Sequence, residues 1–279
     1  MADDNQDKDP EVAEVIHNDF YVDDLLSGSS TTEEAIHLRD GITSLLHTAG
    51  FELRKWASNS EQFLNGIPEN SRESQRLALD SKDGVSTLGL LWLPKKDQLQ
   101  VKNSNPFPTT NVKIDTKRKV LAQVAPIFDP LGLISPSVIV YKTYLQRLWQ
   151  DKLPWDEPLS VQLQDDWDTL SDTIPQLSNI YINRKDICTQ AVNVQLHGFC
   201  DSSETAYGAC FYLRSADLND NAFCNLLCSS SRVAPLKTIT IPRLELCAAV
   251  LLVKLYKRII NALRIPISAT YMWTDSSIV

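Results

Sequence analysis

The order of apolar segments in the last third of the chain places the strongest constraint on its fold. "AVNVQLHGFCDSSETAYGACFYLRS" predicts two strands joined at Asp201, and "AFCNLLCSSSRVA" predicts a third strand. "TITIPRLELCAAVLLVKLYKRIINAL" predicts a long helix with Pro242 in its first turn, and "SATYMWTD" predicts a fourth strand that runs to Asp275. Three strands, a helix and a strand form an α/β unit, which we expect to be cut short at its C-terminus.

Three acidic residues occupy notable places in this unit. Asp201 lies at or near the end of the first predicted strand, Glu245 in the first turns of the helix, and Asp275 at the end of the last strand. Glu245 shares a helix face with the residues four, seven and eleven positions later, so its carboxylate lies on the buried stripe, where an unpaired charge is costly. A few carboxylates can hold two divalent cations about 4 Å apart for phosphoryl chemistry, so the three acids predict a shared metal centre.

Each of these acids also has an alternative structural role. Asp201 could cap a turn with Ser202 and Ser203, and Glu245 could favour the helix dipole near the N-terminus. Asp275 could be the N-cap of a helix that begins at Ser276. Their combination in this order of elements favours the site.

A second acidic motif lies near the start of the chain. "FYVDDLLSG", residues Phe20 to Gly28, places the adjacent aspartates Asp23 and Asp24 between a strand-like run and a glycine. A divalent cation would offset the repulsion between two neighbouring carboxylates, because Mg²⁺ prefers hard oxygen ligands. Aspartates are equally common in ordinary turns, where they bond their own backbone, so this motif alone leaves both interpretations open.

The segments after this motif predict further mixed structure. "TTEEAIHLRDGITSLLHTAG" predicts an amphipathic helix with a capping box from Thr31 and Glu34 and a stop at Gly50. "FELRKW" predicts a strand, "GVSTLGLLWL" and "QLQV" predict a strand pair, and "NSNPFPTTN" predicts a linker.

The middle of the chain predicts helices. Between residues 113 and 151, short helical patterns are broken by Pro126, Pro130 and Pro136, each of which removes a donor and stops a helix. "LPWDEPLSVQLQDDWDTLSDTIPQL" predicts another helix, which "INRKDI" closes.

The charge distribution bears on the kind of partner. A net charge of −8 argues against nucleic acid, whose phosphates require Lys and Arg. However, residues 1–60 carry 13 acidic and 4 basic side chains, whereas residues 82–119 carry 8 basic and 3 acidic ones. A basic middle beside an acidic start is compatible with a polyanion held near metal, although a charge run is usually a solvated face.

Cysteines and hydropathy indicate the compartment. The six cysteines lie mostly in apolar runs of the last third, as reduced core thiols do, and Cys224 and Cys228 have no second ligand pair for zinc. The acidic start "MADDNQDKDP" lacks the features of a signal peptide, and no run reaches the roughly 18 apolar residues of a membrane span. We therefore expect an intracellular protein without a membrane partner.

Seven segments together carry a family resemblance. In this order, "FYVDDLLSG", "GFELRKWASNS", "LGLLW", "FDPLGLISP", "FCDSSETAYGACFYL", "IPRLELCAAVLL" and "WTDSSIV" closely resemble the Pol polyprotein of Pao-type (Bel-Pao) LTR retrotransposons. The resemblance covers nearly the whole chain after about residue 11. It implies an α/β fold: an α+β C-terminal part of a reverse transcriptase palm in residues 1–102, a mainly helical thumb and connection in 103–190, and an incomplete ribonuclease H-like α/β domain in 191–279.

The resemblance also implies roles for residues. Asp23 and Asp24 would be the catalytic pair of the palm hairpin, with Asp23 the firmer metal ligand. Asp201, Glu245 and Asp275 would hold Mg²⁺ or Mn²⁺ in the ribonuclease H centre. Lys55 resembles a lysine that assists proton transfer to pyrophosphate, with an exposed strand position as its alternative role. The primer grip would be Leu88, Gly89, Leu90, Leu91 and Trp92. The nucleic-acid-binding residues of the basic middle would be Lys95, Lys96, Lys113, Lys117, Arg118 and Lys119.

The implied function is RNA-directed DNA synthesis coupled to cleavage of RNA in RNA/DNA hybrids by two-metal catalysis. Its partners would be an RNA template, a DNA primer, the RNA/DNA hybrid and the rest of the Pol polyprotein, and the family implies a cytoplasmic particle and the nucleus. The family's first palm aspartate and fingers, and a fourth ribonuclease H acid, would fall outside this chain. We therefore expect a fragment that does not polymerise DNA and cleaves hybrids at most feebly.

Two alternatives compete with this interpretation. One is a catalytically inactive nucleic-acid-binding remnant of the element. The other is a cellular metal-dependent phosphohydrolase, which leaves "FYVDDLLSG" without a role.

Overall fold

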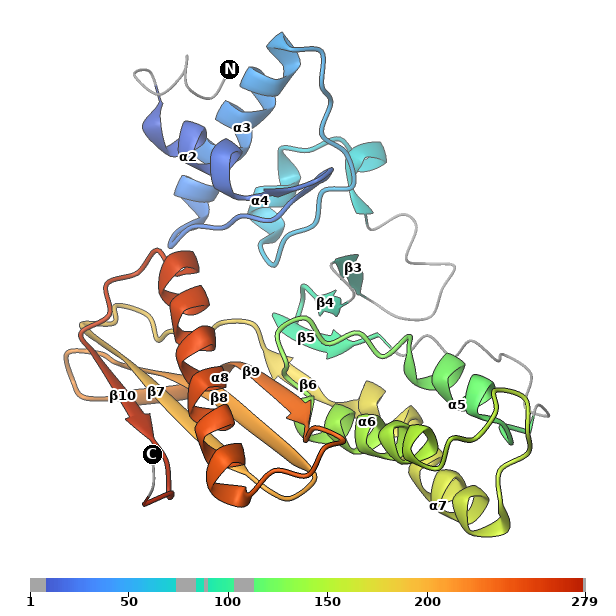
Figure 1. Ribbon diagram of the computed structural model, residues 1–279. Helices are drawn as coiled ribbons and strands as arrows, with labels where there is room; N and C mark the ends of the chain where they lie inside the picture. Colours follow the sequence, from blue (N-terminus) through green and yellow to red (C-terminus); the bar gives the residue numbers. More distant parts are fainter. Residues whose placement is uncertain (1–8, 74–83, 88–89, 103–112, 278–279) are drawn as a thin grey trace. The chain divides into compact units, whose positions relative to one another are not determined.

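A computed structural model describes residues 9–73, 84–87, 90–102 and 113–277 (Figure 1). The chain divides into two compact units, one of Met1–Thr87 with Trp92–Asp97 and one of Leu88–Leu91 with Gln98–Val279. The boundaries expected at residues 102 and 190 stay predictions, and the predicted linker at 103–111 lies outside the described residues. No helix within the described ranges combines the length and the apolar character that crossing a bilayer requires.

The first unit is built around two helices. Its elements are α2 (Pro10–Asn18), β1 (Phe20–Tyr21), β2 (Asp24–Leu25), α3 (Thr32–Thr48), α4 (Glu61–Asn65), the 3₁₀ turn η1 (Glu69–Ser71) and β3 (Val85–Thr87). Helices α2 and α3 share a core of Val12, Val15, Ile42 and Leu46. Gly41 permits their close approach, because a Cβ there would lie 2.6 Å from Val12 Cγ2. Helix α2, which was not predicted, begins with Asp9 as N-cap and Pro10 in its first turn, and both are helix start signals in the sequence.

Helix α3 confirms the predicted capping box. The Glu34 backbone N–H donates to Thr31 Oγ1, and the Thr31 N–H donates to Glu34 Oε2, each at 3.2 Å. The helix ends before Gly50, whose φ of +79° lies in the left-handed region that glycine tolerates.

The predicted strand "FELRKW" is wrong. Lys55 has a φ of +58°, which breaks the extended conformation, and only Trp56 forms an isolated bridge, with Arg72. The backbone at Trp56 bonds instead to Ser71 and Glu73, next to the short turn η1. Local alternation of apolar and polar residues was therefore misleading here, because contacts with a later segment determine the backbone.

The second unit begins with a helical layer on a small sheet. Its helices are α5 (Lys117–Val124), α6 (Ser135–Gln150) and α7 (Val161–Ser171), and its first strands are β4 (Leu90–Leu93), β5 (Gln98–Val101) and β6 (Tyr181–Asn183), which follows the 3₁₀ turn η3 (Pro175–Asn179). Trp167 is fully buried in their core, 5.3 Å from the ring of Tyr144. The Tyr144 hydroxyl donates to the Leu163 carbonyl at 2.7 Å, and burial raises the pKa of Tyr144 to about 12.

Two expectations for this layer are corrected. Pro136 lies in the first turn of α6 and begins that helix rather than stopping one, because the first turn does not use its missing N–H. The segment "INRKDI" does not simply close a helix, because residues 181–183 form β6, which pairs antiparallel with β5.

The last part of the chain forms the predicted α/β unit. Its elements are β7 (Asn193–Ser202), β8 (Ala206–Ala216), β9 (Ala222–Val233), α8 (Ile241–Ala262) and β10 (Ala269–Trp273). The strand order is β10-β7-β8-β9, with β7, β8 and β9 antiparallel in sequence and β10 parallel to β7. Helix α8 lies across this sheet (Figure 1) and buries Leu244, Ala248 and Leu252. Gly198 leaves room beneath the helix, because a Cβ there would lie 2.6 Å from the Phe211 ring.

The edge strand β9 is covered by the segment before α6. The Ser229 N–H donates to the Leu131 carbonyl at 2.9 Å, and the Ser229 hydroxyl donates to the Gly132 carbonyl. Gly132 has a φ of +72°, and a Cβ there would lie 1.9 Å from the Ser229 carbonyl oxygen. The motif "FDPLGLISP" therefore joins the helical layer to the sheet and removes an exposed edge.

A candidate metal centre

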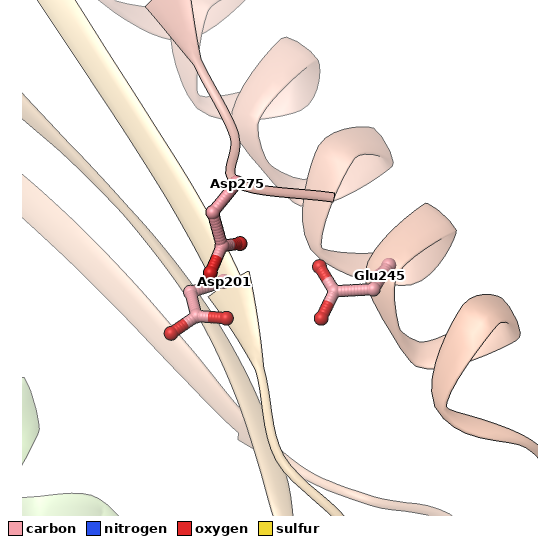
Figure 2. Close-up of side chains that lie close together, drawn as sticks. All are labelled: Asp201, Glu245 and Asp275. Carbon is pink, nitrogen blue, oxygen red and sulfur yellow. The ribbon is translucent and has the colours of Figure 1, made fainter. Parts of the chain in front are cut away.

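The structure brings Asp201, Glu245 and Asp275 together (Figure 2). Each offers one carboxylate oxygen, and these atoms all lie within 4.8 Å of one another. Asp201 is the penultimate residue of β7, and Asp275 follows β10 by two residues. Because β10 runs parallel to β7 with Trp273 opposite Phe199, both aspartates reach the same end of the sheet. Glu245 approaches from α8, which crosses that sheet.

Glu245 is the buried member of the centre. Only 7% of the residue is exposed, as its place on the apolar stripe predicted. Its Oε1 accepts a hydrogen bond from the Ser202 hydroxyl at 2.7 Å, whereas Oε2 is buried without a hydrogen-bond partner among the described residues. A buried carboxylate oxygen without a partner is costly, and a hard divalent cation is a ligand that relieves this cost. The residues present therefore fit an Mg²⁺ or Mn²⁺ ion.

The two aspartates leave the centre open. Asp201 and Asp275 are both exposed, and both line a groove of about 690 Å³ on the surface of the second unit. Pro136 and Ile139 of α6 line the same groove, together with the aromatic rings of Phe199 and Trp273. These two rings stack nearly parallel, with centroids 6.5 Å apart. A ligand larger than a metal ion can therefore reach the carboxylates from solvent.

The structure tests the alternative roles of these acids in different ways. Ser203 closes the β7–β8 turn through bonds with Ala206, and Asp201 contributes only by accepting the Ser202 N–H at 2.6 Å. Glu245 is the fifth residue of α8, where its burial does not suit a purely dipolar role. The helix proposed to begin at Ser276 would extend into residues 278–279, which lie outside the described ranges.

The thiol of Cys200 lies near the carboxylates of the centre, and their negative charge affects its pKa. Its thiol donates to the Trp273 carbonyl at 3.8 Å. Burial raises the pKa of Cys200 above its ordinary value, and the nearby carboxylates of Glu245, Asp201 and Asp275 raise it further. The thiol therefore stays protonated at neutral pH. All six cysteines are free.

The other acidic motif forms an isolated hairpin. Strands β1 and β2 pair antiparallel with Tyr21 opposite Asp24, and Val22 takes a φ of +59° in the turn. Asp23 and Asp24 are both exposed, and within the described ranges no third carboxylate, histidine or cysteine joins them in a metal-ligand cluster. Lys55 is exposed but does not lie in a strand, so its expected strand position is wrong.

The expected primer grip is described only in part. Leu88 and Gly89 lie outside the described residues, and Leu90, Leu91 and Trp92 belong to β4. Leu90 and Leu91 are buried. The Trp92 Nε1–H donates to Asp97 Oδ1 at 3.1 Å. Contact of this strand with a primer stays a prediction.

Several basic residues of the expected nucleic-acid surface have internal partners. Lys117 is 7% exposed, and its ammonium lies 4.9 Å from the ring centroids of both Trp149 and Trp155. Arg118 forms two bonds with Asp156, at 2.7 and 2.9 Å, and Lys119 Nζ pairs with Asp115 at 2.8 Å. Lys95, Lys96 and Lys113 are exposed. The structure thus places Lys117, Arg118 and Lys119 in contacts with other side chains of the protein.

Comparison with known proteins identifies the class of this fold and site. The α/β sheet with its acidic cluster is the ribonuclease H-like part of a retroelement Pol protein. The family model of the Pao retrotransposon-like RNaseH-like domain matches residues 116–276, more than half of the chain, so the chain belongs to this family. The match begins in the helical layer at α5 and ends just after Asp275, so it includes both the layer and the acidic centre.

Two solved structures resemble the chain at 14% sequence identity. One is a foamy viral protease-reverse transcriptase dRH in complex with double-stranded DNA, with a TM-score of 0.44 over 96% of this chain. The other is a foamy viral protease-reverse transcriptase in complex with double-stranded DNA, with a TM-score of 0.32 over 69%. The chain spans only 42% and 37% of those two chains. A search of curated proteins finds no match.

Proposed function

We propose that the sheet of β7–β10 cleaves the RNA strand of RNA/DNA hybrids with divalent metal bound by Asp201, Glu245 and Asp275. One observation carries the proposal: Glu245 has a buried oxygen without a hydrogen-bond partner among the described residues, and its carboxylate lies in a cluster with Asp201 and Asp275 whose ligand atoms are all within 4.8 Å of one another. This arrangement is unfavourable for the empty protein and favourable for a cation-loaded one. Membership of the Pao RNaseH-like family supports a nucleic acid as the substrate.

The three acidic residues would bind the metal from different sides, according to how deeply each is buried. When bound, Mg²⁺ or Mn²⁺ ions activate water and stabilise the leaving oxygen in such centres. Glu245 would hold the metal from the buried side, while Asp201 and Asp275 hold it from the exposed side. The groove beside the two aspartates leaves space for the strand that carries the scissile phosphate.

We also propose a role for the first unit within a longer Pol protein. Asp23 and Asp24 would contribute to a reverse transcriptase centre that acts on an RNA template and a DNA primer. The supporting observation is the exposed hairpin, which presents adjacent carboxylates at its turn. In this chain alone the hairpin has no third acidic partner within the described residues, so the polymerase role requires further chain.

A cleavage assay tests the nuclease proposal. The full chain is incubated with an RNA/DNA hybrid that carries a 5′-labelled RNA strand, in Mg²⁺, in Mn²⁺ or in chelator. We expect slow, metal-dependent cleavage that falls at least about 100-fold in Asp201→Asn, because positioning of the metal is lost. Asp220→Asn is the matched control, since Asp220 is an exposed aspartate in the β8–β9 turn of the same sheet.

The outcomes separate the alternatives. Cleavage that survives both chelator and Asp201→Asn would refute the centre. Hybrid binding without cleavage in either metal would instead identify an inactive nucleic-acid-binding remnant. Cleavage of small phosphate esters without hybrid cleavage would favour a phosphohydrolase.

A further inference from the structure

Ser202 contacts two of the three carboxylates at once. Its backbone N–H donates to Asp201 Oδ1 at 2.6 Å, and its hydroxyl donates to Glu245 Oε1 at 2.7 Å. The second bond joins strand β7 to helix α8 across 43 residues of sequence. Within the described part of the chain, the other oxygen of Glu245, Oε2, has no hydrogen-bond partner.

The strand geometry explains how one residue reaches both acids. Successive side chains in a strand point to opposite faces, so every second residue of β7 faces α8. Leu196, Gly198 and Cys200 alternate on the face that α8 covers, and Ser202 continues that series. Its hydroxyl therefore lies beneath the helix, where it meets Glu245.

The pattern of bonds on Glu245 does not suit a purely structural hydrogen bond. A glutamate buried for stability would have partners for both oxygens, because each unsatisfied buried acceptor costs free energy. Here the Ser202 hydroxyl holds Oε1, whereas Oε2 stays without a partner. Holding one oxygen limits rotation of the carboxylate, which lies beside Asp201 and Asp275 (Figure 2), and leaves the other oxygen without a hydrogen-bond partner among the described residues.

We propose that Ser202 is a positioning residue of the metal centre, whose hydroxyl holds Glu245 so that one glutamate oxygen stays available to a divalent cation. This inference rests on the proposed function, because it names the group that orients a ligand of the same centre. Partners that orient metal-ligating side chains typically change metal affinity or activity by about 10- to 100-fold when they are removed.

Three variants of the full chain test the role. Ser202→Ala removes the hydroxyl, and Ser202→Thr keeps a hydroxyl on a residue that strands favour. Ser203→Ala is the matched control, because the Ser203 hydroxyl bonds to Thr205 and Ala206 within the turn. Mn²⁺ affinity is measured by isothermal titration calorimetry, and the Mg²⁺ concentration for half-maximal hybrid cleavage is measured on the same preparations.

We expect Ser202→Ala to weaken Mn²⁺ binding by about 10- to 100-fold and to shift the Mg²⁺ dependence of cleavage to higher concentration, with activity recovering at high Mn²⁺. Ser202→Thr restores the affinity to within a few-fold, and Ser203→Ala leaves it unchanged. A structural role alone would lower stability without moving the metal dependence, so unfolding in urea is followed in parallel.

Different results would contradict the positioning role of Ser202 and the metal centre itself. Loss of Mn²⁺ binding in Asp201→Asn together with wild-type affinity in Ser202→Ala would overturn the positioning role and leave the centre intact. Absence of Mn²⁺ binding by the wild-type chain would overturn both.

Discussion

The chain carries two groups of acidic residues, and they differ in how firmly the fold holds them. Asp23 and Asp24 lie on a hairpin of two-residue strands and are exposed. Asp201, Glu245 and Asp275 lie on a ten-residue strand, a 22-residue helix and the end of a parallel strand, and one of them is buried. The hairpin motif is the more recognisable in sequence, yet the cluster is the better-formed site. A buried carboxylate oxygen without a hydrogen-bond partner is therefore a stronger indication of metal binding than two adjacent exposed carboxylates.

The strongest test of this contrast is DNA synthesis. We expect the chain alone to show no detectable primer extension on an RNA template, because Asp23 and Asp24 lack a third acidic partner in the described ranges. Losing the position of metal and nucleotide costs many orders of magnitude in rate. A primer-extension assay measures this, with hybrid cleavage by the same preparation as the control for folding. Incorporation that disappears in Asp24→Asn would show that the hairpin is a complete site.

A second test compares stability with and without metal. Glu245→Gln removes a buried charge from a cluster of three carboxylates, so without metal we expect it to raise the free energy of unfolding by about 1 kcal/mol. Wild-type protein gains about 2.7 kcal/mol when Mn²⁺ is present at 100 times its Kd, and the variant should gain little of this. Urea unfolding with and without Mn²⁺ measures both effects.

The effect of Glu245→Gln on stability is expected to have opposite signs without and with Mn²⁺, which distinguishes a metal ligand from a structural residue. A site residue lowers stability in the empty protein and raises it in the loaded one, whereas a structural residue does not change sign. Asp24→Asn should alter neither value if the hairpin binds no metal by itself. Equal Mn²⁺ stabilisation of Glu245→Gln and wild type would remove Glu245 from the centre.

Much of the nuclease-like unit was predictable because its signals are local. Alternating apolar residues predicted β7, β8 and β9, and the apolar stripe of α8 placed Glu245 on a buried face. Strand ends then located Asp201 and Asp275. The order of these elements was enough to suggest convergence, since neighbouring parallel strands end on the same side of a sheet.

The errors arise where distant contacts decide the structure. Strand β6 pairs with β5, with Asn183 opposite Gln98, and nothing in its local sequence indicates that partner. Lys117 is a typical exposed residue by type, yet it is buried against Trp149 and Trp155. Ser202 was considered only as a turn residue, although the alternation of β7 continues to it and its hydroxyl bonds Glu245 of α8.

A third test distinguishes the metal centre from a partly buried acid elsewhere in the same unit, Asp186. Burial raises the pKa of Asp186 to about 6 from 3.8, despite a hydrogen bond from Asn225. A raised acid contributes stability that is fully present below pH 3.8 and is lost as pH rises through about 6. The Asp186→Asn variant should therefore be more stable than wild type by about 1 to 3 kcal/mol at pH 7.5, with the difference closing toward pH 4.

Urea unfolding from pH 4 to 8 measures the difference in stability between Asp186→Asn and wild type. Any pH dependence that remains in Asp186→Asn can then be examined for a contribution from the metal centre. A wild-type stability curve that coincides with that of the variant over the whole range would show that Asp186 titrates normally.

The smallest expected effect concerns nucleic-acid binding by the basic middle. Each phosphate contact contributes about 0.9 to the slope of log affinity against log salt for duplex DNA. Arg118 and Lys119 are already paired with Asp156 and Asp115, so Arg118→Ala should change the slope by much less than one contact. The exposed Lys95 and Lys113 are better placed to release counterions. Replacing both by Ala should lower the slope by up to about 2, measured by fluorescence anisotropy with a labelled hybrid. A larger loss in Arg118→Ala would mean that its ion pair opens on binding, and the hybrid would then contact α5 directly.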